Sequence, residues 1–160
     1  MKKYENLQLL AEKNKPLFLE YYKKNKKRLG KMDGVVHQLH DDVSADIDCL
    51  SCANCCRSLG PAIYDKDIER IAKALRMKPS DVVTTYLRID EDGDYVFQSM
   101  PCPFLMADNY CSVYEHRPKA CREYPHTDRK KFEQIFKLTV KNTSTCPIAY
   151  EVMTKLINKY

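Results

Sequence analysis

The sequence is poor in glycine, with 4 residues of this type among 160. No two of them stand at the spacing of a nucleotide-binding GxGxxG loop or of a phosphate-binding GxxxxGK loop. The patterns GxSxG, HExxH and the EF-hand calcium loop are missing as well. These absences exclude the nucleotide sites most easily read from sequence and the familiar hydrolase, zincin and calcium-binding classes. The glycines are Gly30, Gly34, Gly60 and Gly93.

Long apolar runs are also missing. Nothing approaches the roughly 20 consecutive apolar residues that a membrane-spanning helix requires. Charged residues such as Glu12 and Lys13 interrupt the N-terminal segment, so it lacks the apolar core of a secretory signal. We therefore expect a soluble, cytoplasmic protein without membrane association, whose thiols stay reduced.

The length and composition predict one folded domain. A domain contains roughly 100–200 residues, and a chain of 160 residues with 44% hydrophobic residues can fill its core. Apolar residues at helical spacing are typical of a mainly α-helical fold. The N-terminal segment, which contains Pro16, is expected to form two consecutive helices or one kinked helix. The predicted helices cover residues 3–28, 31–42, 64–77, a short stretch from Pro79 to Leu87, and 148–160.

Shorter patterns interrupt the predicted helices. The acidic, glycine-containing stretch 90–94 is typical of a turn. The apolar segment 95–97 and the runs 104–105 and 111–114 predict a short hairpin or small sheet. The expected fold is therefore a single, mainly α-helical domain with a small β hairpin and cysteine-rich metal-binding loops.

The net charge of +5 is concentrated near the N-terminus. Residues 1–31 contain ten Lys and Arg residues and three acidic residues. Residues 32–160 contain seventeen Lys and Arg residues and nineteen acidic residues. We predict a basic N-terminal helical arm over residues 1–31 and a cysteine-cluster metal-binding domain over residues 32–160. The basic run 23–28 fits phosphate attraction to nucleic acid, or it is the solvated end of a helix that stops at Gly30.

Cysteine is abundant, with 8 residues among 160. This share is below the roughly 8–10% that is typical of a small secreted disulfide scaffold. In a reducing compartment, clustered cysteines more often bind metal or take part in redox chemistry than form disulfides. The cysteines are Cys49, Cys52, Cys55, Cys56, Cys102, Cys111, Cys121 and Cys146.

The run from residue 49 to residue 56 carries the strongest indication of a metal site. Two residues separate each of its first three cysteines, a spacing that lets a tight loop direct sulfur atoms toward one metal centre. Polar residues such as Ser51 and Asn54 lie between the cysteines, unlike the pattern of buried core thiols. Disulfides are another alternative, but the adjacent Cys55 and Cys56 count against them because vicinal bridges are strained.

Further motifs follow the cysteine run along the chain. They are Cys102-Pro103-Phe104-Leu105, Cys111 with Val113-Tyr114, Arg117-Pro118, Cys121-Arg122 and Tyr124-Pro125. With the CxxCxxCC run at 49–56, they resemble the YkgJ-type cysteine-cluster family, a zinc- or iron-chelating domain. The resemblance covers residues 49 to about 147 and implies metal binding without a settled reaction.

Bacterial flagellin lysine N-methylase resembles the same family through its cysteine motif. This resemblance implies that an iron–sulfur cluster is an option for the present chain. The chain is too short to be that enzyme, and it has no recognisable loop for S-adenosylmethionine. Methyl transfer is therefore a minor alternative.

All-sulfur coordination suits both zinc and iron–sulfur clusters, so the expected cofactor is one of the two. Eight thiolates suffice for two centres of four sulfur atoms each. One allocation joins Cys49, Cys52 and Cys55 to the remote Cys146, which precedes a proline as in ferredoxins. The other four would then form a second centre or stay as free thiols. They are Cys56, Cys102, Cys111 and Cys121.

Several side chains near the cysteines are candidates to support the ligands. An arginine can donate to a thiolate sulfur and offset its charge, and the resemblance favours Arg117 and Arg122 for this role. Tyrosines in the same motifs are expected to pack against the centre. The full set is Arg57, Tyr114, Arg117, Arg122 and Tyr124. A catalytic metal would need an open position or a non-cysteine ligand, for which the candidates are His37, His40, His116 and His126.

The leading interpretation is a metal-binding protein that holds zinc or an iron–sulfur cluster through cysteine thiolates, in a structural or redox role. One alternative is an enzyme that uses the metal cluster for electron transfer or for protein modification such as lysine N-methylation. A further alternative is a nucleic-acid-binding module that uses residues 1–31. Zinc contributes about 10–16 kcal/mol in small modules, so metal removal is expected to unfold the cysteine-bearing loops.

Overall fold

The computed structural model describes residues 4–160. In this range the chain is mainly α-helical, with one two-stranded antiparallel sheet, which confirms the predicted fold class. The chain divides into two compact units, which we call the helical unit (Met1–Asp48 with Pro125–Tyr160) and the cysteine unit (Cys49–Tyr124). The division predicted between residues 31 and 32 stays a prediction. Every described helix is too short or too polar to cross a lipid bilayer.

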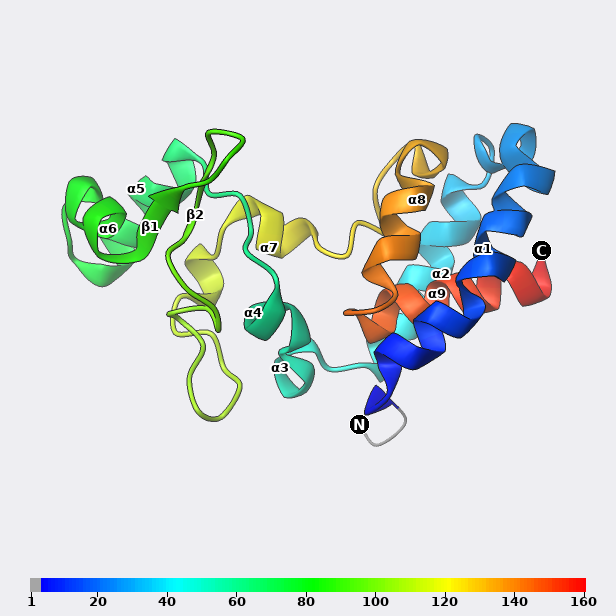
Figure 1. Ribbon diagram of the computed structural model, residues 1–160, viewed down its shortest axis with the longest axis horizontal. Coiled ribbons are helices and arrows are strands. Elements are labelled where there is room, and N and C mark those ends of the chain that lie inside the picture. Colours follow the sequence, from blue (N-terminus) through cyan, green and yellow to red (C-terminus); the bar gives the residue numbers. More distant parts are fainter. Residues whose placement is uncertain (1–3) are drawn as a thin grey trace. The chain divides into compact units, whose positions relative to one another are not determined.

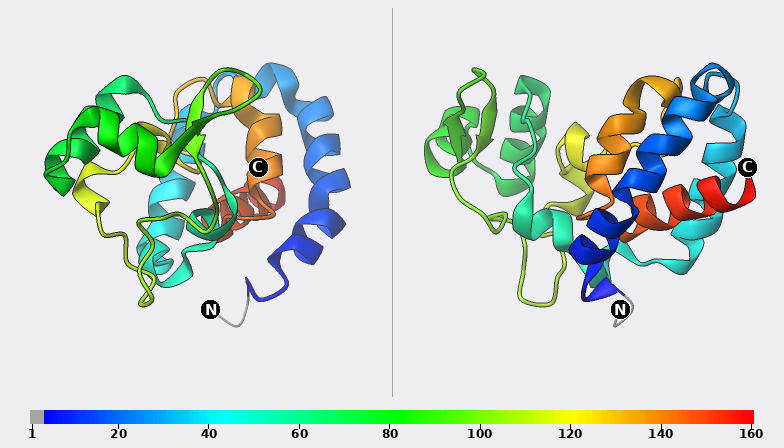
Figure 2. Two further views of the ribbon diagram at one scale, coloured as in Figure 1. Left: turned by 60° about the vertical axis from the view of Figure 1, so that its left-hand side comes forward. Right: turned by 45° about the vertical axis from the view of Figure 1, so that its right-hand side comes forward.

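The helical unit is built from four long helices. They are α1 (Leu7–Leu29), α2 (Asp33–Asp46), α8 (Phe132–Asn142) and α9 (Pro147–Lys159). Helix α1 lies against α8 and α9, and α2 lies against α9 (Figures 1 and 2). The N-terminal segment is one helix that contains Pro16, and not two consecutive helices.

Aromatic side chains fill the core of the helical unit. Phe18, Phe132 and Phe136 are fully buried. The ring of Phe136 lies 5.0 Å from the ring of Tyr22 on α1 and 5.6 Å from that of Phe132, measured between ring centroids. Such pairs contribute about 0.5–1.5 kcal/mol beyond the burial of their area. The contact of α1 with α8 therefore includes large aromatic rings, of which that of Phe136 is fully buried.

The start of α8 is held by a residue from a distant part of the chain. One carboxylate oxygen of Asp33 accepts a hydrogen bond from the amide of Lys131 at 2.7 Å, and the other accepts one from the amide of Phe132 at 2.9 Å. Helix starts need such acceptors because their first amides have no partner within the helix. No helix was predicted in this region from the sequence. The residue that caps the start of α8 lies on α2, far from α8 along the chain.

We expect Asp33→Ala to lower the free energy of unfolding by about 1–2 kcal/mol, because two helix-start amides lose their acceptor. Denaturation in urea, followed by circular dichroism, measures this change. Asp41→Ala is the matched control, because Asp41 is exposed on the same helix and the substitution removes the same charge. Equal losses of stability in the two variants would contradict the capping role.

The folded core of the cysteine unit lies between two helices and a hairpin. Helices α5 (Asp65–Leu75) and α6 (Pro79–Tyr86) precede strands β1 (Leu87–Ile89) and β2 (Tyr95–Phe97), which pair in antiparallel fashion with Leu87 opposite Phe97. Figure 1 shows the hairpin beside α6. The buried core residues are Ile63, Ile68, Ile71, Ala72, Val82, Leu87, Phe97, Phe104 and Val113.

The hairpin differs from the expected pairing. Strand β2 pairs with β1, whose first residue, Leu87, was expected to end the preceding helix. Within the described residues, only an isolated bridge joins Leu105 to Cys111. In the connecting turn, the side chain of Asp90 accepts hydrogen bonds from the amides of Asp92 and Asp94 at 3.0 and 2.9 Å. These bonds close the predicted acidic turn and set the register of the two strands.

Candidate metal centre

Seven of the eight cysteines belong to the cysteine unit, where short elements carry them. Helix α3 (Cys49–Cys52) begins and ends with a cysteine, and α4 (Asn54–Ser58) contains the adjacent Cys55 and Cys56. Cys102 and Cys111 lie in the loop region after β2, and α7 (Lys119–Glu123) carries Cys121. Cys146 belongs to the helical unit, where it is buried at the start of α9.

Backbone contacts bring distant cysteine segments together. The amide of Cys102 donates to the carbonyl of Cys56 at 2.8 Å, which joins α4 to the loop after β2. The bridge between Leu105 and Cys111 then places Cys111 beside the same loop. Cys102 and Cys111 also pack against the buried core of the cysteine unit. The thiols therefore lie at the edge of this core.

Four thiols lie close enough for their charges to interact. The pKa of Cys102 is raised to about 11. Burial is the main cause, and the neighbouring sulfur atoms of Cys56 and Cys111 also contribute. Burial likewise raises the pKa of Cys121 to about 12, with contributions from Cys102, Cys56 and Cys111. The pKa of Cys111 is also raised, first by burial and then by Cys56. These four cysteines form what we call the thiol cluster.

Cys56 differs from the other members of the thiol cluster. A hydrogen bond from the Cys55 side chain, assisted by the charge of Arg57, lowers the pKa of Cys56 to about 7. Cys56 also raises the pKa of Cys52, although burial contributes more to that shift. One member of the cluster is therefore ready to ionise near neutral pH, and its charge acts on the thiols around it.

Two arginines supply positive charge to the cluster. Arg57 lowers the pKa of Cys56, and Arg117 lowers the pKa values of Cys111 and Cys121. Four thiolates around a divalent ion leave two negative charges uncompensated, and two guanidinium groups offset them. The charges on this side of the unit therefore match a four-sulfur metal site.

Hydrogen bonds fix both arginines. Arg57 donates to the carbonyl of Cys52 at 3.0 Å and to the side-chain oxygen of Asn109. Arg117 donates to the carbonyl of Tyr114 at 2.9 Å, and its guanidinium lies 3.9 Å from the centroid of the Tyr114 ring. Tyr114 therefore orients Arg117 through a cation–π contact.

The other two supporting candidates lie at α7. Arg122 is exposed on this helix, and its amide donates to the carbonyl of Pro118 at 3.1 Å. Tyr124 follows the helix, is partly buried, and donates its amide to the carbonyl of Ala120 at 3.2 Å. These contacts fix the backbone of α7, and the roles of both side chains stay predictions.

The donor chemistry of the thiol cluster fits zinc or an iron–sulfur cluster, both of which take four cysteine sulfurs. Within residues 4–160, no three side chains of His, Cys, Asp or Glu converge closely enough to hold one ion. If these four thiols were to bind one metal centre, their sulfur atoms would have to draw together from the positions described above.

The short helices that carry cysteines have few apolar contacts of their own. Helices α3, α4 and α7 have four or five residues each, and none of their residues is fully buried. Helices shorter than about 12 residues are marginal in water without packing. The cysteine unit thus has a region that its hydrophobic core does not stabilise.

A comparison with protein families matches residues 48–147 to the family described as "CxxCxxCC: Putative zinc- or iron-chelating domain". The chain belongs to this family. The match confirms the resemblance drawn from the motifs. Comparisons with curated proteins and with solved structures gave no match.

Two of the four candidate histidine ligands of this CxxCxxCC protein have hydrogen-bond partners in the helical unit. In the helical unit, His37 lies 3.1 Å from the carbonyl oxygen of Arg129, and Nδ1 of His40 lies 2.6 Å from the hydroxyl of Thr127. His116 is exposed at the end of the 3₁₀ turn Tyr114–His116. The rings of His37 and His40 are therefore positioned by contacts within the helical unit.

Two residues of the site were not found from the sequence. Asn109 has a left-handed backbone with φ of 68°, and its side-chain amide donates to the carbonyl of Ser51 at 3.3 Å. Asp67 is buried and contacts the start of α7. Asparagine tolerates left-handed backbone better than most residues, but neither tertiary contact leaves a local pattern.

We expect the metal-free CxxCxxCC protein to lose stability as the pH rises above about 9. The pKa values of Cys102 and Cys121 are higher in the folded protein than the ordinary value near 9. The unfolded chain therefore releases these protons first, and ionisation favours unfolding. Urea denaturation at pH 7.5 and pH 10, with chelator and reductant present, measures the loss. Cys121→Ser should show a smaller loss, and an unchanged loss would contradict this origin.

Proposed function

We propose that this protein binds a metal centre through the four sulfur atoms of the thiol cluster, in a structural role. The observation that carries the proposal is that four thiols, from α4, the loop region after β2 and α7, lie close enough within one unit to influence one another's ionisation. Membership of a zinc- or iron-chelating family supports the same conclusion. The metal is zinc or an iron–sulfur cluster.

The size of the hydrophobic core supports a structural role. A unit below roughly 80 residues rarely gains more than about 3–5 kcal/mol from its core, and small natural domains often add a structural metal. Here the core lies among α5, α6 and the hairpin, whereas α3, α4 and α7 contribute no buried residue. A metal held by Cys56 and Cys121 would join α4 to α7 directly.

The ligand set supports this role as well. Catalytic zinc sites keep an open position beside three protein ligands, whereas structural sites are closed by four. The thiol cluster offers four sulfur donors and two compensating arginines, Arg57 and Arg117. We infer that the centre closes on itself and fastens the segments around it. The predicted ligand roles of Cys49, Cys52, Cys55 and Cys146 stay predictions.

Metal identity is tested on freshly purified, anaerobically handled protein. Elemental analysis gives the metal and its stoichiometry, and the visible spectrum separates the two candidates. A brown protein with broad absorption and bound iron indicates a cluster, whereas a colourless protein with stoichiometric zinc indicates a zinc site. A protein that takes up neither metal when reconstituted would contradict the proposal.

We expect Cys102→Ser to remove one metal centre per chain, because serine cannot replace a thiolate in an all-sulfur site. Ser112→Ala is the control, since Ser112 is exposed in the same loop region and has no sulfur atom to offer a metal. Metal content after reconstitution and dialysis measures the difference. Urea denaturation of both metal-free variants shows whether either has lost its fold. Retention of the full metal content by Cys102→Ser would refute the proposed ligand set.

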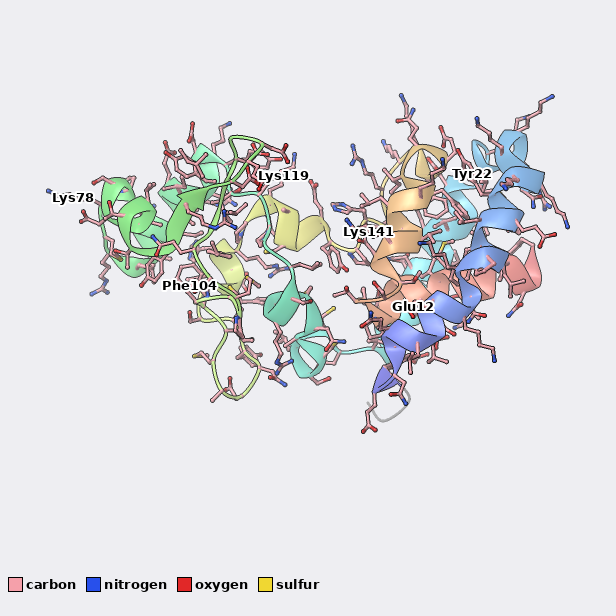
Figure 3. The ribbon with its side chains drawn as sticks, viewed as in Figure 1. Glu12, Tyr22, Lys78, Phe104, Lys119 and Lys141 are labelled. Carbon is pink, nitrogen blue, oxygen red and sulfur yellow. The ribbon has the colours of Figure 1, made fainter. Side chains whose placement is uncertain are left out.

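A second function is favoured by the distribution of charge in the helical unit. We propose that α1 and α8 together bind the phosphate backbone of nucleic acid. The basic run at the end of α1, from Lys23 to Arg28, is exposed in all but one of its residues. On α8, Lys137 lies 5.8 Å from the centroid of the Tyr22 ring of α1. Figure 3 shows Lys141 on α8 and Tyr22 on α1 in this unit.

The basic residues of the helical unit extend beyond the arm predicted from the sequence. Residues 129–141 add five basic side chains to those of α1, against one acid, Glu133. Helix α2, by contrast, carries acids and no lysine or arginine. This separation of charge is typical of proteins that attract a polyanion through a single face.

We expect the combined change of Lys23, Lys27 and Lys137 to Glu to weaken binding of a 20-nucleotide duplex at least tenfold. The slope of log affinity against log salt should become shallower, because each lost phosphate contact removes about 0.9 from it. Fluorescence anisotropy measures both quantities, and Lys155→Glu on α9 is the control. An absence of duplex binding by the wild-type protein at low salt, or equal binding by all variants, would refute this second function.

A further inference from the structure

Asp67 is the one charged side chain that is fully buried among residues 4–160, with 1% of its surface exposed. It lies in the first turn of α5, the helix that contributes Ile68, Ile71 and Ala72 to the core of the cysteine unit. An ionised carboxylate in such a place is costly unless hydrogen bonds and an opposite charge compensate it. The hydrogen-bond partners of Asp67 therefore indicate which segments its carboxylate joins.

The carboxylate joins α5 to the start of α7. One oxygen accepts a hydrogen bond from the amide of Tyr64, at the beginning of its own helix, at 3.0 Å. The other accepts one from the amide of Lys119, 52 residues later, at 3.0 Å. Figure 3 shows Lys119 at the beginning of α7. The first contact is local helix capping, whereas the second is a tertiary contact with the segment before Cys121.

Arg70 completes the arrangement. Its Nη2 lies 2.5 Å from the Asp67 oxygen that accepts the Lys119 amide, and it also donates to the carbonyl of Arg117 at 3.3 Å. Asp67 and Arg70 thus hold the peptide groups on both sides of Pro118. Proline has a fixed φ and no amide hydrogen, so little freedom remains in this segment.

The held segment leads directly to a member of the thiol cluster. The carbonyl of Pro118 accepts hydrogen bonds from the amides of Cys121 and Arg122 at 3.0 and 3.1 Å. Helix α7 has five residues and none of them is fully buried, so its own packing fixes Cys121 only weakly. The orientation of Cys121 depends on what anchors the beginning of the helix.

We propose that Asp67, together with Arg70, is a positioning residue that holds Cys121 in place for metal binding. This inference rests on the proposed function of the thiol cluster. Residues outside the coordination sphere that orient a metal ligand typically change affinity by 10–100-fold when they are replaced. Asp67 acts through the backbone of α7, and it connects the ligand to the helix that contributes Ile68, Ile71 and Ala72 to the core of the cysteine unit.

Cobalt(II) is the probe for this inference, because its thiolate charge-transfer absorption reports on sulfur coordination as well as on affinity. We expect Asp67→Ala to weaken Co²⁺ binding 10–100-fold and to reduce the charge-transfer absorption per bound ion. Asp65→Asn is the matched control, since it removes a negative charge from the same helix turn at an exposed position. It should bind Co²⁺ as the wild type does.

A double-mutant cycle with Cys121→Ser separates positioning from a general effect on folding. If Asp67 acts through Cys121, then Asp67→Ala should change Co²⁺ affinity less than threefold in the Cys121→Ser background. Equal weakening in both backgrounds, or no weakening in either, would overturn the inference. Wild-type protein without any thiolate–cobalt absorption would overturn the proposed function, and the inference with it.

Asp67→Asn provides a second test that disturbs the fold less than Asp67→Ala. Asparagine keeps the shape and one acceptor for the Lys119 amide, but it loses the charge that pairs with Arg70. We expect an intermediate loss of Co²⁺ affinity, with the charge-transfer absorption nearer to that of the wild type. If Asp67→Asn folds and binds Co²⁺ with unchanged affinity and spectrum, the inference fails even where Asp67→Ala does not fold.

Discussion

Several thiols gathered at the edge of a small core cannot all ionise unless positive charge is present among them. This electrostatic constraint explains the features around the thiol cluster. Burial and mutual proximity keep the thiols of Cys102 and Cys121 neutral in the metal-free protein, while Arg57 and Arg117 reduce the cost of ionisation. A divalent ion would reverse the balance, since its charge favours the thiolate form of every ligand.

The cysteine unit divides its stabilisation between two regions. Helices α5 and α6 and the hairpin pack around an apolar core, as an ordinary small domain does. The cysteine-bearing helices are held by polar contacts, such as the hydrogen bond between Cys102 and Cys56 and those of Arg57 with α3 and Asn109. Polar contacts of this kind fix geometry but contribute little net stability, so a bound metal of the proposed kind would add to the stability that the core supplies.

The sequence was most informative where the signal is local. The stripe of apolar residues with Asp65 and Asp67 in its first turn predicted α5, and the cysteine spacing predicted the family. Helix α8 was not predicted, although Phe132, Phe136 and Val140 line its buried face, because the acceptor that starts it is Asp33 on another helix. The pairing of β2 with β1 depended on Leu87, which fits the end of a helix equally well from its neighbours alone.

Two residues of the site were not predicted from the sequence, because their contacts are with residues far along the chain. Asp67 looks like an ordinary acid in the first turn of a helix, and its bond to the amide of Lys119 has no counterpart in the neighbouring residues. The same holds for Asn109, which resembles a simple turn residue and yet bonds to α3. Family motifs identify which side chains carry the chemistry, whereas the residues that orient them are recognised from the tertiary structure.

The cysteine unit is inserted between the two sequence segments that form the helical unit. During synthesis, α1 and α2 therefore leave the ribosome well before α8 and α9, with which they share their core. Translation of the intervening residues takes on the order of 4–15 s at roughly 5–20 residues per second. Throughout that interval Phe18 lacks its later partner Tyr150, and Asp33 has no helix to cap. Synthesis of the cysteine unit is therefore complete before the helical unit can close its own core.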